Sequence, residues 1–193
     1  MKYSELIKLN DRAKRVRERL DIKDGDGFSW TITKENDEQH EIVLNNVKTP
    51  EELEDDIASI FVWLWNLKDY VKKYSKIHGY PSNWVEEQIN LDFNLCICGD
   101  IANGIKHGGL DRKTRSNKKP KLGNIHYQVE GNAIDKIVVQ AFKVLFDVSQ
   151  PDQVSLSMDV YDENGEKIGD AFKLLDYAIS AWNEIIQQIQ RHA

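Results

Sequence analysis

The sequence predicts an α+β fold in which a four-helix bundle carries a small antiparallel β-sheet inserted before the last helix. Three observations predict this class. Four segments repeat apolar residues at the spacing of an amphipathic helix, two regions alternate apolar and polar residues, and turn-forming residues separate them. At 193 residues, the chain fits a single domain, residues 1–193, with a core of its own.

The helices of the bundle are predicted at residues 3–20, 49–77, 82–107 and 170–192. The second has the clearest beginning, because Thr49 suits the N-cap, Pro50 suits the first helical position and two acidic residues follow. Ser82 is the predicted N-cap of the third helix. Each helix carries an apolar stripe, so we expect the four to share one core.

β-Structure is predicted within residues 28–44 and 124–169. In the first region Phe28, Trp30 and Ile32 alternate with polar residues, which is typical of a half-buried hairpin. In the second region strands are predicted at residues 125–129, 137–148 and 154–160, and a tight turn at residues 162–165. We expect these strands to form a three- or four-stranded antiparallel meander, which the hairpin around Phe28 can join.

Composition excludes several classes of protein. The chain is 40% hydrophobic and 30% charged, as in ordinary globular proteins, which argues against a disordered or membrane-embedded chain. It has no apolar run near the roughly 18 residues that cross a bilayer and no apolar segment after its N-terminus, so we expect no membrane partner and a cytoplasmic location. Cys96 and Cys98 point to opposite sides of a helix and are predicted to stay thiols.

Positive charge is concentrated in one part of this acidic chain. The net charge of −6 argues against coating nucleic acid by bulk attraction, but residues 106–121 hold seven basic residues against one acid. Residues 108–123 lack apolar periodicity and are predicted to be a loop. The candidate phosphate-binding residues are Lys106, Arg112, Lys113, Arg115, Lys118 and Lys119. The alternative is a solvated loop, since no aromatic residues are interleaved to stack on bases.

One side of the third predicted helix gathers short polar and reactive side chains instead of the Lys and Glu of a solvated face. At about 100° per residue, five of them fall within about 80° of one another: Asp92, Cys96, Asp100, Asn103 and His107. This polar stripe is either a solvated face or a site whose residues hydrogen-bond and transfer protons. Gly99 and Gly104 favour a site, because each costs the helix about 1 kcal/mol relative to Ala, a cost best understood if another backbone or a ligand comes close.

The end of this helix resembles the signature of HEPN domains, in which an Arg, commonly an Asn, three further residues and a His follow one another. Here Asn103 and His107 hold the last two positions, and Ala102 occupies the position of the Arg. The resemblance implies a helical domain of the kind found in metal-independent ribonucleases of prokaryotic defence or toxin systems, which act as dimers. The missing Arg removes a partner for transition-state charge, so the resemblance fits a non-catalytic or divergent relative.

If the protein cleaves RNA, the resemblance assigns His107 as general acid or base, since its ordinary pKa lies near neutrality. Asn103 is then expected to orient the 2′-hydroxyl or a phosphate oxygen, and Asp100 to hold the imidazole tautomer. No metal or cofactor is expected, because the stripe mixes hard and soft ligands and no CxxC or HxxxH pattern supports it.

Two functions follow from these observations. The first is a HEPN-like module that binds or cleaves RNA, with RNA and a second copy of the chain as partners. The second is a non-enzymatic interaction or dimerisation module, in which the polar stripe is an interface for a protein partner.

Overall fold

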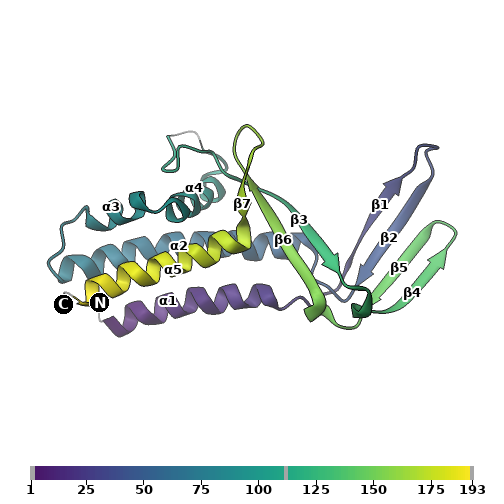
Figure 1. Cartoon of the computed structure of the whole chain (residues 1–193), viewed down its shortest axis with the longest axis horizontal. Helices are drawn as coiled ribbons and strands as arrows, with labels where there is room; N and C mark the ends of the chain where they lie inside the picture. Colours follow the sequence, from purple (N-terminus) through teal and green to yellow (C-terminus); the bar gives the residue numbers. More distant parts are fainter. Residues whose placement is uncertain (1–2, 111–112, 192–193) are drawn as a thin grey trace. The chain divides into compact units, whose positions relative to one another are not determined.

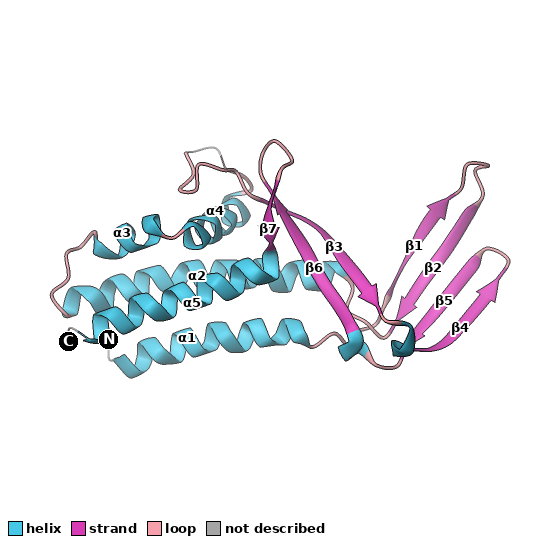
Figure 2. Ribbon diagram, in the orientation of Figure 1, coloured by secondary structure: helices cyan, strands magenta, loops and turns pink. Residues whose placement is uncertain are grey.

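A computed structural model describes residues 3–110 and 113–191 of the chain. Over these residues there are five α-helices and seven strands in two sheets (Figures 1 and 2). The class is α+β, as predicted. The predicted four-helix bundle with one small sheet is wrong, because the third predicted helix is broken into two and the strands form two separate sheets.

The chain divides into two compact units. The helical unit comprises the described parts of Met1–Glu18, Ile57–Asn124 and Met158–Ala193, and the sheet unit comprises Arg19–Asp56 and Ile125–Ser157. The prediction that residues 1–193 form a single domain stays a prediction, since units of this size also occur as parts of one cooperatively folded domain.

The helices are α1 (Tyr3–Glu18), α2 (Pro50–Ile77), α3 (Trp84–Leu91), α4 (Phe93–His107) and α5 (Ala171–Arg191), with short 3₁₀ helices at Arg19–Asp21, Gly131–Ala133 and Pro151–Gln153. Within the helical unit, α5 contacts both α1 and α4. The core there is built from fully buried side chains that recur along each helix, among them Leu6, Ile60, Leu64, Leu95, Ile97, Leu175 and Trp182. None of the helices in the described part of the chain has the length and low charge that crossing a bilayer requires.

The beginning of α2 confirms the predicted N-cap. The Thr49 hydroxyl accepts a hydrogen bond from the Glu52 amide at 3.1 Å, and the Glu52 carboxylate accepts one from the Thr49 amide at 2.9 Å. This reciprocal pair is a capping box, which satisfies two amides that the first helical turn leaves without partners.

The unbroken helix predicted at residues 82–107 is wrong. Ser82 is not an N-cap, since α3 begins at Trp84 after Asn83. Asp92 then adopts extended backbone angles and accepts a hydrogen bond from the Leu95 amide at 2.9 Å, which caps the separate helix α4. An Asp side chain that bonds a backbone amide competes with helical geometry, so it ends one helix and starts the next.

One sheet has the strand order β1 (Phe28–Thr33), β2 (Gln39–Asn45), β5 (Lys143–Val148) and β4 (Ile134–Gln140). The hairpin of β1 and β2 is confirmed, with Phe28 opposite Leu44. The predicted meander is wrong, because β2 pairs in parallel with β5 and the strand predicted at residues 137–148 is two antiparallel strands.

The other sheet has the order β3 (Lys121–Val129), β6 (Val154–Tyr161) and β7 (Lys167–Asp170). The tight turn between β6 and β7 is confirmed, with Gly165 at a φ of 80° and its amide bonded to the Asp162 carbonyl. The loop predicted at residues 108–123 is shorter than expected, since β3 begins at Lys121.

Candidate functional site

The residues predicted to be catalytic line one pocket at the C-terminal end of α4. Its volume is about 520 Å³, and its lining residues are Asp100, Asn103, His107, Gly109, Leu110, Lys113, Thr114 and Arg115. Three of these belong to α4 and the rest to the segment that follows it. Polar residues of α4 and residues 109–110 and 113–115 of the basic segment, which we define as residues 106–121, therefore line one pocket.

Asp100 holds the basic segment against α4. Its side chain is only 2% exposed, and its carboxylate accepts hydrogen bonds from the Arg115 amide at 3.0 Å, the Ser116 amide at 2.9 Å and the Ser116 hydroxyl at 2.6 Å. Asp100 and His107 are separated by about 10 Å along the helix axis. Within the described residues no hydrogen bond joins Asp100 to His107, so the carboxylate serves the loop instead of the predicted imidazole.

The middle of the polar stripe is not a solvated helix face, since every residue from Leu95 to Ala102 is buried. Asn103 is half-buried and His107 is exposed. Conversely Leu91 and Phe93, which flank the break at Asp92, are 81% and 52% exposed. The break ends the helical phase of α3, so Leu91 does not continue the buried side of α4.

Arg115 is fixed by partners from outside the stripe. One terminal nitrogen of its guanidinium donates to the Asn90 amide oxygen at 2.9 Å, and the other lies 2.7 Å from the Glu86 carboxylate. The guanidinium also lies 5.1 Å from the ring centre of Trp65, a cation–π contact. These partners leave the charge of Arg115 largely compensated.

The carboxylate of Glu86 gathers three cations. Arg115 is joined there by Lys72 at 3.0 Å and Lys68 at 3.8 Å. Burial opposes ionisation of Glu86, but the Lys72 hydrogen bond and the three positive charges prevail and lower its pKa. Sequence reasoning missed Glu86, Asn90 and Trp65 as supports of the site, since no local spacing links them to Arg115.

Three of the predicted phosphate-binding residues do not line the pocket. Lys106 donates to the Asn66 amide oxygen at 2.6 Å, Lys118 lies 2.7 Å from Asp162, and the backbone amide of Lys119 donates to Glu163 at 2.8 Å. Arg112 lies outside the described residues. Of the six predicted cations, the structure thus places Lys113, which is exposed, and Arg115 at the pocket.

The Lys118 ion pair makes a pH-dependent contribution to folding. Its hydrogen bond lowers the pKa of Asp162, against the effect of burial, and the amides of Asn164 and Glu166 lower it further. The stabilisation is therefore present above the ordinary pKa of 3.8 and is lost as the pH falls through the lower folded value. We expect NMR titration of the Asp162 carboxyl to have its midpoint below 3.8, and Lys118→Met to raise that midpoint more than Lys119→Met. Equal midpoints in the two variants would contradict the assignment of the ion pair.

The position of the HEPN Arg faces the core in this chain. Ala102 is fully buried, so a longer cationic side chain has no room there without repacking. Lys113 and Arg115 are the cations nearest to the Asn103 and His107 pair among the residues that line the pocket. The cations that line the pocket thus belong to the segment after α4 and not to the helix itself.

Both cysteines are buried free thiols, as predicted. Burial raises the pKa of Cys96 and of Cys98, so both are held in the protonated, unreactive form. In the described part of the chain, no group of three or more His, Cys, Asp or Glu side chains is placed to hold a metal ion.

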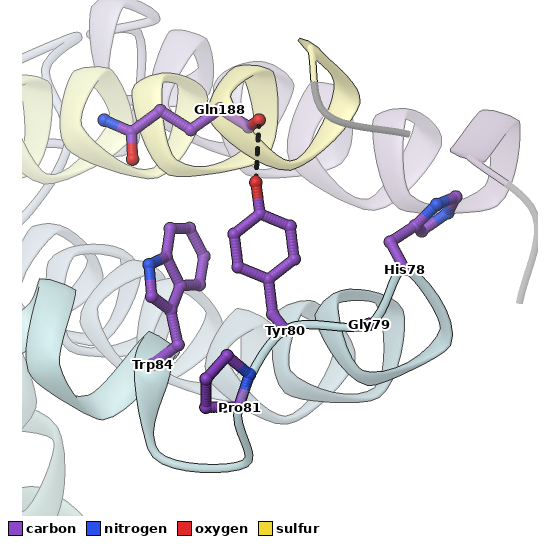
Figure 3. Close-up of a pocket in the computed structure, with 6 residues that line it drawn as sticks. All are labelled: His78, Gly79, Tyr80, Pro81, Trp84 and Gln188. Carbon is purple, nitrogen blue, oxygen red and sulfur yellow. Dashed lines mark hydrogen bonds between the residues drawn. The ribbon is translucent and has the colours of Figure 1, made fainter.

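A second hollow of about 450 Å³ lies where the turn after α2 meets α5 (Figure 3). Tyr80 and Trp84 point toward α5 with their ring centres 4.3 Å apart, and the Tyr80 hydroxyl donates to the Gln188 carbonyl at 3.2 Å. His78 is the one titratable lining residue other than Tyr80. This hollow has fewer groups able to bind an anion or transfer a proton than the pocket on α4.

No protein-family model, curated protein or solved structure matches this chain. The resemblance to HEPN domains therefore stays a prediction, and the proposed function rests on the geometry of the pocket.

Proposed function

We propose that the pocket at the end of α4 binds the sugar-phosphate backbone of single-stranded RNA. The observation that carries the proposal is the convergence of Asn103, His107 and Lys113 on one pocket from two different segments. An amide, an imidazole and an ammonium together supply hydrogen-bond donors for phosphate oxygens and an acceptor for a ribose hydroxyl.

Lys113 is the cation best suited to contact a phosphate. The guanidinium of Arg115 is already bound to Glu86 and Asn90, whereas Lys113 is an exposed residue of the pocket lining. The anchoring of Arg115 and Ser116 by Asp100 restricts the segment that carries Lys113. A segment held in this way loses less conformational entropy on binding than a free loop does.

Binding is favoured over cleavage as the main activity. Ribonuclease chemistry needs a positive group held in place at the charge that develops on the phosphate. Ala102 offers none, Arg115 is already paired with Glu86, and Lys113 is an exposed side chain. His107 is an exposed imidazole that lines the pocket, so cleavage is tested alongside binding. We propose that the protein acts in the cytoplasm. The HEPN resemblance implies a role in a prokaryotic defence or toxin system.

The test is fluorescence anisotropy with a labelled single-stranded RNA of about 12 nucleotides. We expect Lys113→Ala to weaken binding about fivefold, the effect of one ion pair of about 1 kcal/mol. The slope of log affinity against log salt should fall by about 0.7, as for one lost phosphate contact on a single strand. Asn103→Ala should reduce the preference for RNA over DNA of the same sequence, since DNA lacks the 2′-hydroxyl.

The matched control is Lys173→Ala, which removes one exposed lysine of α5 that does not line the pocket. It should change neither the affinity nor the salt slope beyond the bulk effect of one charge. Equal losses in the Lys113 and Lys173 variants would exclude this pocket as the binding site. Incubation of end-labelled RNA in EDTA from about pH 5 to about pH 9 reports cleavage, which His107→Ala should abolish if it occurs.

The alternative of a non-enzymatic interaction module stays a prediction. Within the polar stripe, Cys96 and Asp100 are buried beneath the chain's own residues. A protein partner on the stripe would therefore contact the half-buried Asp92 and Asn103 and the exposed His107.

A further inference from the structure

The four-stranded sheet has one face that is almost entirely apolar. The strand register places the following residues on that side: Phe28, Trp30, Ile32, His40, Ile42, Leu44, Ile137, Val139, Val144 and Phe146. The ring of Phe142, in the turn between β4 and β5, lies 5.9 Å from the His40 ring. We call this set the apolar face.

Half of the apolar face is covered by the sheet unit's own residues. Phe28, Leu44 and Phe146 pack with Tyr127 and Val129 of β3, and the ring centres of Phe28 and Tyr127 are 4.8 Å apart. This contact makes the small hydrophobic core of the unit.

The other half of the apolar face is open. Five large apolar side chains there are between 43% and 73% exposed: Trp30, Ile32, Ile137, Val139 and Phe142. With roughly half of about 200 Å² exposed on each, they present about 500 Å² of contiguous apolar surface. That is near the upper limit for the largest patch on a monomer, and patches of this size commonly mark interaction sites.

The opposite face of the same sheet is mixed. Val43, Leu145 and Val138 form one half-buried apolar row across it, and polar or charged residues lie on either side of that row. Glu41 pairs with Lys143 at 2.9 Å, and Asn45 donates to Asp147 at 2.7 Å. Gln140, next to Val139 on β4, is exposed on that side. The two faces therefore differ in degree. The large exposed apolar side chains of the sheet lie on the apolar face, so that face gains more from being covered.

We propose that a second copy of this chain packs on the open half of the apolar face, sheet against sheet, to form a symmetric dimer. Stable interfaces bury about 800 Å² per partner. The five exposed side chains supply about 500 Å² of this area, and the residues around them have to supply the rest. The apolar face holds no Asp, Glu, Lys or Arg, and its one titratable side chain, His40, is bonded to Glu38 of its own copy.

The row across the sheet formed by Trp30, Ile42, Val144 and Val139 makes the face complementary to itself. Consider a twofold axis that lies between the two sheets and runs parallel to the strands. It places the row of one copy over the row of the other copy, with the residues in the opposite order. Trp30 of one copy then lies over Val139 of the other, so that the largest side chain meets a small one. Two sheets packed about 10 Å apart leave room for such interdigitated side chains.

Sedimentation equilibrium of the full chain, from about 1 to about 100 µM, tests the proposal. We expect the wild-type mass to approach twice 22.4 kDa. Val139→Lys should weaken the dimer at least about 30-fold, because it buries an unpaired charge at the interface. The matched control is Gln140→Lys, which adds the same charge one residue away on the opposite face and should leave the dimer intact.

Disulfide trapping provides a measurement that does not depend on a weakened variant. Because Cys96 and Cys98 are buried, a chain with Trp30→Cys mixed with a chain with Val139→Cys offers one accessible thiol on each copy. Mild oxidation should cross-link these two chains and should not cross-link Trp30→Cys with Gln140→Cys. A monomeric wild type at the highest concentration overturns the proposal, as does a dimer that Val139→Lys leaves unchanged. The outcome is independent of whether the pocket on α4 binds RNA.

Discussion

Replacing Asp100 with alanine is expected to lower the free energy of unfolding by about 3 kcal/mol and to free residues 113–116 from α4. The carboxylate accepts three hydrogen bonds from Arg115 and Ser116, and hydrogen bonds to a charged group are stronger than neutral ones. In the variant, two backbone amides and a hydroxyl either stay buried without a partner or pull the loop into water. Urea denaturation measures the first effect, and hydrogen exchange of the Arg115 and Ser116 amides measures the second.

Asp92→Ala is the matched control for this experiment. Asp92 also bonds a backbone amide of its own segment, that of Leu95 at the beginning of α4, but it does not touch the loop. Its loss should cost about 1 kcal/mol, as for other N-caps, and should leave the exchange of the Ser116 amide unchanged. Unaltered protection of Arg115 and Ser116 in Asp100→Ala would show that the loop is held by other contacts. RNA affinity should fall with loop order, which makes Asp100 a positioning residue of the proposed site.

Gly99→Ala is expected to destabilise the protein by about 1 to 3 kcal/mol, whereas Gly104→Ala on the same helix should stabilise it by up to about 1 kcal/mol. A Cβ at Gly99 would lie 2.6 Å from the Trp65 ring, which is buried between α4 and the cations of Lys68 and Arg115. A Cβ at Gly104 would meet only Leu110, at an ordinary 3.5 Å. Helical propensity then decides the effect at Gly104, and overpacking decides it at Gly99.

A double-mutant cycle with Trp65→Leu separates overpacking from propensity. If the ring causes the clash, the cost of Gly99→Ala should largely disappear in the Trp65→Leu background, while Gly104→Ala should have the same effect in both. Urea unfolding followed by circular dichroism gives the free energies of all six proteins. An undiminished cost of Gly99→Ala in the Trp65→Leu background would trace the effect to the helix backbone instead.

Gly99 and Gly104 show how much of the site could be predicted from the sequence. Their presence inside a helix indicated a close approach from outside, and at Gly99 that approach exists. The neighbour is the side chain of Trp65 and not a ligand, and at Gly104 there is only the ordinary contact of Leu110. Periodicity identifies a position that needs a small residue, but it does not identify the group that comes close.

Local sequence by itself determined the capping box at Thr49, the hairpin of β1 and β2, the tight turn after Asp162 and the polar residues of α4. These features depend on residues within a few positions of one another, so short-range hydrogen bonds and alternation specify them.

The tertiary structure alone decided the rest, because it joins residues far apart in the chain. The parallel pairing of β2 with β5 splits the predicted sheet, and the extended backbone at Asp92 splits the predicted helix. Long-range contacts also turned Asp100 from a catalytic candidate into the anchor of the basic segment. They compensate Arg115 and Lys118 with carboxylates that no spacing reveals, and Lys113 is left as the cation that the proposed RNA site depends on.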